Sequence, residues 1–207
     1  MARTFEIKKE KTALLIIDLQ NDFIRKGAPL YVDSAYETLA PVRKLLDFAR
    51  SKEMPVIFAR FVSGKTPTLL WNWSPEIKSD NCCKRGHERY YADIDKTLQC
   101  SETVDELLPY MPSDYVIEKY NYSVFRNTNL KDILHSEDVD TLIVTGTVTQ
   151  VCVEDTVHDG FAEGYKMVVA EDCVSSWDEV QHRATLDNIA HKFGMVSHSQ
   201  DLMDLLK

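Results

Sequence analysis

The sequence predicts an α/β fold of three layers, in which helices cover both faces of a mostly parallel, Rossmann-like sheet of five or six strands. The first observation behind this prediction is periodicity: short segments rich in valine and isoleucine alternate with longer stretches of helical period, as in βαβ units. The second is a length of 207 residues with 44% hydrophobic and 28% charged side chains, enough to bury a substantial core. We therefore expect a single domain spanning residues 1–207.

The expected strands are short and share a high content of β-branched residues. They lie at 12–18, 55–61, 114–119, 140–146 and 166–172, with a weaker pattern at 195–198. The expected helices lie at 36–52, 101–110, 128–136, 150–164 and 178–193, followed by a short C-terminal helix that Ser199 caps. Nearly continuous apolar strands between helices indicate a sheet that is buried on both faces.

Residues 62–100 form the one long region without clear periodicity. In a compact α/β domain, an insert of this size without regular elements is typical of a lid or a specificity loop. Trp71 and Trp73 could close over a site as an aromatic lid or pack at a subunit interface. We expect the lid.

The composition disfavours several functions. Asp and Glu number 33 against 24 Lys and Arg, a formal charge of −9, so the chain is poorly suited to a nucleic-acid backbone. No signal-peptide pattern opens the chain, and no apolar run approaches the ~18 residues of a membrane span. We therefore expect a cytoplasmic protein that binds neither nucleic acid nor membrane. Its five cysteines are expected to be free thiols in that reducing compartment.

Three chemically capable side chains stand at the ends of expected strands. Asp18 ends the first strand, Lys119 ends the third, and Cys152 lies in the turn after the fourth. Because strand ends of an open parallel sheet face one crevice, we expect a carboxylate, an amine and a thiol to converge. Each also has a simpler possible role. Asp18 could cap a turn, Lys119 could extend from a strand end into solvent, and Cys152 could fill the core.

The position of Cys152 favours a reactive thiol. It is expected in the first turn of a helix that Gly164 closes, where unpaired N–H groups and the helix dipole stabilise a thiolate. A neighbouring Lys119 ammonium would lower the pKa of the thiol further. Asp18 could take a proton from the thiol and pass it to a leaving amine.

Three segments resemble the signature segments of the isochorismatase-like cysteine hydrolases. They are IIDLQNDF at 16–23, EKYNYSVFRNTNL at 118–130 and GTVTQVCVEDTVHDGFAEGY at 146–165. The resemblance covers about residues 11–200. Within this family, the three segments are similar in kind to those of nicotinamidases and of N-carbamoylsarcosine, ureidoacrylate and biuret amidohydrolases. The resemblance implies a catalytic triad of Asp18, Lys119 and Cys152, and a homo-oligomer that is a dimer or tetramer.

The same resemblance implies how the reaction would run. A non-proline cis peptide between Thr147 and Val148 would orient the N–H groups of Val148 and Cys152 as an oxyanion hole. Cys152 would attack an amide or ureido carbonyl of a small molecule to form a thioester, which water activated by Asp18 would hydrolyse. Phe23 would line the substrate pocket, although it could equally be a core residue.

Two departures from the family pattern narrow the expected chemistry. Metal-binding nicotinamidases carry an Asp and His set after the second strand, and residues 58–67, FARFVSGKTP, contain neither. This favours a metal-independent enzyme without a cofactor. True isochorismatases lack the cysteine nucleophile, so Cys152 favours hydrolysis of a linear C–N bond over an ether. A metal-dependent nicotinamidase and a non-catalytic small-molecule-binding member are the alternatives.

A few further residues are candidates for substrate or metal contacts. Tyr122 and Gln150 flank the expected lysine and cysteine and could hydrogen-bond a substrate amide, or be ordinary polar loop residues. Cys82 and Cys83 are adjacent and could suggest zinc, together with His87. A structural zinc needs about four ligands, and no second pair at metal-binding spacing completes this set. We therefore expect no metal there.

Overall fold

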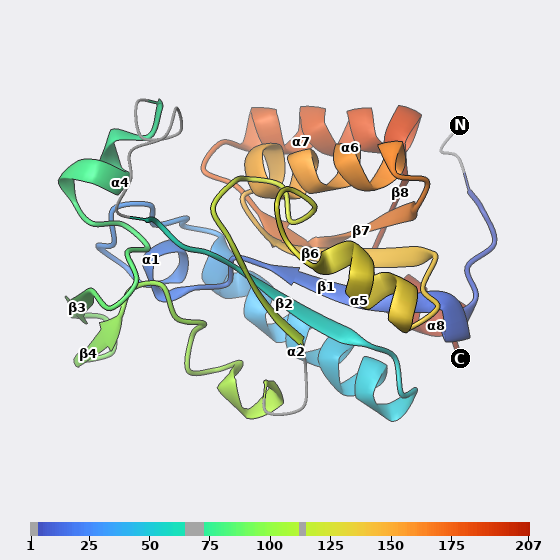
Figure 1. Ribbon diagram of the computed structural model, residues 1–207, viewed down its shortest axis with the longest axis horizontal. Helices are drawn as coiled ribbons and strands as arrows, with labels where there is room; N and C mark the ends of the chain where they lie inside the picture. Colours follow the sequence, from blue (N-terminus) through green and yellow to red (C-terminus); the bar gives the residue numbers. More distant parts are fainter. Residues whose placement is uncertain (1–3, 65–72, 112–114) are drawn as a thin grey trace.

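A central sheet of six parallel strands organises the protein (Figure 1). The computed structural model describes residues 4–64, 73–111 and 115–207. The strand order is β5-β2-β1-β6-β7-β8. The strands are β1 (Thr12–Ile17), β2 (Val56–Phe61), β5 (Tyr115–Lys119), β6 (Thr141–Thr147), β7 (Lys166–Ser175) and β8 (Met195–Ser197). Each begins within one residue of its predicted start, so the predicted fold class is confirmed.

Helices cover both faces of this sheet because its strands alternate their apolar side chains. Leu14 and Ile16 of β1 belong to one buried cluster, and Leu15 and Ile17 belong to the other. The first cluster includes helices α2 (Ala35–Ser51) and α8 (Ser199–Leu205), and the second includes α5 (Leu130–Ser136), α6 (Glu154–Ala162) and α7 (Glu179–Asn188). The result is three layers (Figure 1). No helix in the described ranges is both long and apolar enough to cross a membrane.

Two predictions about local structure are wrong. Residues 101–110 are not an α-helix but an irregular segment that ends in a 3₁₀ turn, Leu108–Tyr110. Thr103 in this segment bridges to Gln20, and the Val104 N–H donates to the Leu19 carbonyl, so tertiary pairing overrides the helical pattern. The cap of α8 is also different. The His198 ring accepts the Gln200 N–H, while the Ser199 hydroxyl donates to Asp172.

The insert at 62–100 contains more regular structure than predicted. Its described part holds helix α4 (Pro75–Ser79) and the antiparallel pair β3 (Glu88–Tyr91) and β4 (Lys96–Gln99). These elements lie beside α1 (Asn21–Ile24), beyond the carboxyl end of β1 (Figure 1). Each element has only four or five residues, and most of their side chains are at least partly exposed, so they produce little apolar periodicity.

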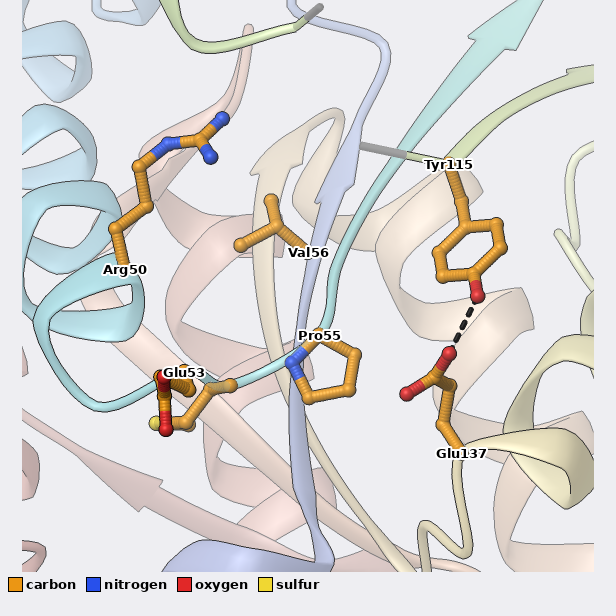
Figure 2. A pocket seen from close by; sticks show the side chains of 7 residues that line it. Arg50, Glu53, Pro55, Val56, Tyr115 and Glu137 are labelled. Carbon is orange, nitrogen blue, oxygen red and sulfur yellow. Dashed lines mark hydrogen bonds between the residues drawn. The ribbon is translucent and has the colours of Figure 1, made fainter. Parts of the chain in front are cut away.

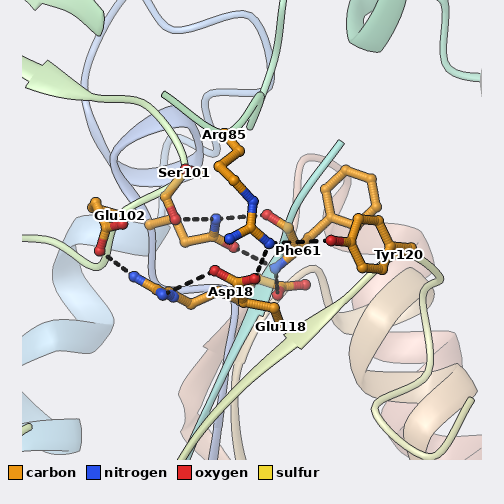
Figure 3. Close-up of polar contacts among 9 residues, drawn as sticks. Asp18, Phe61, Arg85, Ser101, Glu102, Glu118 and Tyr120 are labelled. Atoms are coloured by element: carbon orange, nitrogen blue, oxygen red, sulfur yellow. Dashed lines mark hydrogen bonds and ion pairs between the residues drawn. The ribbon is translucent and has the colours of Figure 1, made fainter. Parts of the chain in front are cut away.

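Charged side chains attach the insert to β2 and β5 (Figure 3). Glu118 of β5 accepts hydrogen bonds from Arg60, at 3.2 Å, and from Arg85 of the insert. Arg60 also pairs with Glu102, and Arg85 donates to the Tyr120 hydroxyl at 3.1 Å. The insert is therefore held against the sheet edge at which the predicted catalytic residues lie.

Candidate active site

The structure brings the three predicted catalytic residues together at the carboxyl edge of the sheet. Asp18 follows β1, Lys119 ends β5, and Cys152 lies in a π-helical turn, Thr149–Val153, after β6. Lys119 Nζ lies 2.7 Å from Asp18 Oδ2, and both side chains are fully buried. Cys152 is 5% exposed, and its thiol interacts with Asp18 and Lys119 by hydrogen bonding and charge.

Gly146 allows β6 to approach β1 at this point. Its φ of +114° lies in the region that favours glycine. A Cβ atom at this position would lie 1.9 Å from the Ile17 carbonyl oxygen, far inside contact distance. Only glycine therefore fits where the backbone leads from β6 into the turn that carries Cys152.

Hydrogen bonds hold Asp18 in one orientation (Figure 3). Its Oδ1 accepts the Phe61 N–H at 2.8 Å, while Oδ2 accepts from Lys119. Gln20 Oε1 accepts the same N–H at 2.8 Å, and its amide donates to the carbonyls of Phe61 and Ser101 at 2.8 and 2.7 Å. Gln20 is not among the residues predicted from sequence. An amide side chain two residues after the strand-end Asp18 is the signal that could have indicated it.

Burial dominates the electrostatics of the cluster. It raises the pKa of Asp18, against the opposing effect of the Lys119 charge. Burial alone would lower the pKa of Lys119, but the charges of Asp18 and Cys152 outweigh it, and the net shift is upward. Burial also raises the pKa of Cys152, and neighbouring Asp18 adds to this, although Lys119 opposes it. The expectation of a stabilised thiolate is therefore wrong, because desolvation exceeds the effect of the ammonium.

Lys119 is held from several sides. Besides Asp18, its ammonium donates to the Asn121 carbonyl at 3.2 Å. It also lies 5.5 Å from the centroid of the Phe61 ring, in cation–π contact. The ammonium is thus fully engaged within the protein rather than directed toward solvent.

The turn that carries Cys152 has the backbone that the family resemblance implies. The peptide bond between Thr147 and Val148 is cis. The Thr156 hydroxyl donates to the Cys152 carbonyl at 2.6 Å and accepts the Val124 N–H at 3.1 Å. Thr156 thereby connects the turn to the segment that follows β5, the strand that ends at Lys119.

A cavity of about 140 Å³ opens onto Cys152. Two residues that were predicted to contact substrate, Phe23 and Tyr122, line it. Gln150 does not, and its side-chain carbonyl accepts from the Ser176 hydroxyl at 2.7 Å. Trp71 lies outside the described residues. The described residues that line it are Phe23, Leu30, Phe61, Ser74, Ile77, Tyr122, Val148, Val151, Cys152 and Trp177.

Trp177 and Ile77 line the cavity although sequence patterns did not indicate them. Trp177 lies between β7 and α7, and its indole N–H donates to the Tyr31 carbonyl at 3.0 Å. Ile77 comes from α4 of the insert. Neither residue stands at a strand end or in a signature segment, so only the tertiary structure reveals their position. Trp73, by contrast, is 77% exposed and does not line the cavity.

A second cavity, of about 320 Å³, lies at the opposite edge of the sheet (Figure 2). It is formed where β2 and β5 begin, and the Tyr115 hydroxyl donates to Glu137 across it. Its lining is Arg50, Glu53, Met54, Pro55, Val56, Tyr115 and Glu137. These described lining residues include no cysteine, serine or lysine, so the smaller cavity beside Cys152 is the better candidate for covalent chemistry.

Cys82 and Cys83 lie in a buried group with Asp22, whose potential ligand atoms are all within 4.8 Å of one another. The carboxylate of Asp22 already accepts from Arg89 Nε at 2.9 Å, the Tyr91 hydroxyl at 2.7 Å and the Cys83 N–H at 2.8 Å. These donors occupy the oxygen atoms that a metal ion would need. We call Asp22, Cys83, Arg89 and Tyr91 the Asp22 cluster, because together they join α1 to the insert.

The parallel α/β sheet and the buried cysteine, lysine and aspartate at its edge define a class of hydrolases, and comparison with known families agrees. The family model described as the Isochorismatase domain matches residues 12–201, and the chain belongs to this family. The resemblance inferred from the three signature segments is thus confirmed.

Individual relatives show the branch of the family to which the chain is similar. The chain is 32% identical to the ureidoacrylate amidohydrolase RutB of Pseudomonas syringae pv. syringae (strain B728a), over 94% of this chain and 83% of that protein. A cysteine hydrolase structure from Pseudomonas syringae pv. phaseolicola 1448A is 29% identical, with a TM-score of 0.86 over 98% of this chain and 95% of that one. N-carbamoylsarcosine amidase from Thermoplasma acidophilum is 27% identical, with a TM-score of 0.72 over 91% and 96%.

Proposed function

We propose that this protein is an amidohydrolase that cleaves a linear C–N bond of a small amide or ureido compound, with Cys152 as its nucleophile. The observation that carries this proposal is the contact of Asp18 and Lys119, 2.7 Å apart and fully buried, beside the thiol at the base of a cavity. The names of the amidohydrolase relatives support the same reaction class.

The first step forms a bond between the Cys152 sulfur and the substrate carbonyl carbon. The thiol passes its proton to the Asp18 carboxylate as the sulfur attacks, because burial raises the pKa of the thiol and favours its protonated form. The N–H groups of Val148 and Cys152 donate to the oxyanion that develops. The Lys119 ammonium compensates the negative charge during this step and keeps Asp18 in place.

The second step breaks the C–N bond and regenerates the enzyme. Asp18 donates its proton to the leaving nitrogen, which departs as ammonia or an amine and leaves a thioester on Cys152. Water then attacks the thioester, and Asp18 takes a proton from this water and returns one to the sulfur. Each cycle consumes one water and needs no redox partner.

Replacement of the nucleophile tests the proposal directly. We expect Cys152→Ala and Cys152→Ser to lower ammonia release by on the order of 10³-fold or more across ureidoacrylate, N-carbamoyl amino acids, nicotinamide and biuret. Cys173→Ala is the matched control, since Cys173 is also fully buried but lies in β7 away from the cavity. Unchanged turnover in Cys152→Ala contradicts the mechanism. Inactivity of the wild type toward the whole panel favours the non-catalytic binding alternative.

Metal independence is tested separately. We expect enzyme dialysed against a chelator, and shown to be metal-free by elemental analysis, to keep its turnover. Loss of turnover that returns with zinc or iron favours the metal-dependent nicotinamidase alternative. The homo-oligomer, the cytoplasmic location and the role of the insert as a lid stay predictions, of which light scattering tests the first.

A further inference from the structure

The walls of the cavity beside Cys152 are apolar. Among the described residues that line it, polar side-chain atoms come from Cys152, Ser74, Tyr122 and the Trp177 indole alone. The hydroxyls of Ser74 and Tyr122 lie 3.3 Å apart and hydrogen-bond one another. The remaining described wall consists of aliphatic and aromatic side chains from α1 and the segment after it, β2, α4, the Cys152 turn and the residue before it, and the segment before α7.

The buried cation beside Cys152 is not available to a substrate. Lys119 is fully buried, donates to Asp18 and Asn121, and is covered by the Phe61 ring. No arginine, lysine or histidine from the described ranges 4–64, 73–111 and 115–207 lines the cavity. A carboxylate bound there would lose its hydration without gaining a paired cation, which is strongly unfavourable.

The apolar walls are held in place before any substrate binds. The Trp177 indole N–H is fixed to the Tyr31 carbonyl at 3.0 Å. Phe23 is 4% exposed, and its carbonyl accepts the Val32 N–H at 2.9 Å. The volume of about 140 Å³ is well below the roughly 300–1,000 Å³ of sites for drug-sized ligands, so the group bound there is compact.

We propose that the substrate carries a compact, uncharged, apolar group on the scissile carbonyl, and that the site discriminates against a carboxylate at that position. This inference rests on the proposed amidohydrolase function. The apolar group gains from leaving water against Phe23, Ile77 and Trp177, whereas an anion of the same shape does not. The preferred substrate then differs in charge from an anion such as ureidoacrylate.

Two amides of matched shape test the proposal. 4-Methylpentanamide and succinamate differ only in carrying an isopropyl group or a carboxylate at the far end of the same chain. We expect kcat/KM for ammonia release to favour 4-methylpentanamide by about 100-fold or more. Equal or faster Cys152-dependent hydrolysis of succinamate overturns the proposal.

A binding experiment keeps this test independent of turnover. Calorimetric titration of Cys152→Ala with the two amides measures which one the cavity holds when no bond can break. Tighter binding of 4-methylpentanamide supports the proposed pocket chemistry even if the wild type hydrolyses neither amide, in which case only the proposed reaction fails. Equal or tighter binding of succinamate overturns the pocket chemistry and leaves the proposed reaction standing.

Substitutions of residues that line the cavity test which side chains determine the preference between the two amides. We expect Trp177→Ala to raise KM for 4-methylpentanamide about 10-fold with little change in kcat, and Trp177→Phe to restore most of the loss. Leu30→Arg is expected to shift the preference at least 10-fold toward succinamate, because it adds a cation to the wall. Phe161→Ala is the control, as Phe161 on α6 is 50% exposed, similar to Trp177 at 48%, but does not line the cavity. An unchanged preference in Leu30→Arg contradicts the proposal.

Discussion

Asp18 and Asp22 are two fully buried carboxylates only four residues apart, and each is paired with a cation. Asp18 lies 2.7 Å from Lys119, and Asp22 lies 2.9 Å from Arg89. They differ in their other neighbours. Both carboxylates lie near thiols, but Asp18 contacts Cys152, which lines a cavity, whereas Cys82 and Cys83 beside Asp22 are fully buried and do not line that cavity. Asp22 instead accepts from groups of the insert, including the Tyr91 hydroxyl. A buried ion pair with a nearby thiol therefore does not by itself mark a catalytic site, and the cavity makes the distinction.

The largest expected effect is on catalysis, at Asp18. Asp18→Asn keeps the shape of the side chain and removes its ability to accept the thiol proton. We expect kcat/KM to fall by about 10³-fold, within the usual range for loss of a general base, with the circular dichroism spectrum unchanged. Steady-state ammonia release is the measurement. A loss of less than 10-fold would place Asp18 with Asp22 as a structural carboxylate.

The next largest expected effect is a loss of folding stability when Arg89, the cation paired with Asp22, is replaced. Arg89→Met leaves the buried Asp22 charge without its cation, and we expect the free energy of unfolding to fall by roughly 3 kcal/mol. Urea unfolding gives this value, and Arg183→Met is the control because its pair with Glu179 is exposed to solvent, so little change in stability is expected. The folded Arg89→Met protein is expected to retain its kcat. A collapse of kcat without loss of stability would contradict the structural role.

A smaller effect is expected at Tyr91, whose hydroxyl donates to Asp22 at 2.7 Å. Tyr91→Phe removes one hydrogen bond to a buried charge, so we expect a loss of about 1.5–3 kcal/mol in urea unfolding. Tyr90→Phe is the matched control, since Tyr90 is 58% exposed and hydrogen-bonds Asp95 at the surface. Equal losses in the two variants would show that Asp22 does not depend on this donor.

The pH dependence of kcat/KM tests whether Asp18 acts as a base, because protonation of its carboxylate removes that ability. Because burial raises the pKa of Asp18, protonation removes the base at a pH above the ordinary carboxyl value of 3.8. Below that raised pKa, kcat/KM should fall about tenfold per pH unit. Above it the profile should stay level past neutral pH, because the pKa values of Cys152 and Lys119 are also raised. An inflection between pH 6 and 8 that persists in Asp18→Asn would belong to a different group and would indicate a thiolate mechanism instead.

The three residues that meet at the sheet edge could be predicted because their placement depends on local pattern. Asp18 and Lys119 end apolar strands, and Cys152 follows one, so a parallel sheet brings them to one edge. The same reasoning from local pattern gave a wrong prediction for residues 101–110. The pairing of this segment with Gln20 and Leu19 involves residues about 80 positions away, and no local period records such a contact.

The cavity walls and the protonation of the site could not be predicted in this way. Trp177 and Ile77 come from segments without a signature, and they meet only when the loop before α7 and the insert pack against α1. The thiol pKa was predicted in the wrong direction, because helix position and Lys119 can be read along the chain but the depth of burial cannot.

The sequence by itself determined the order of strands and helices, the family, and the three residues that converge at the sheet edge, because periodicity and strand ends are local properties. The tertiary structure alone decided that Asp18 lies beside a cavity while Asp22 holds the insert, that burial raises the pKa of the Cys152 thiol, and that the described lining of the cavity is mostly apolar. Desolvation and long-range contacts govern these features, and both depend on which distant segments surround a group.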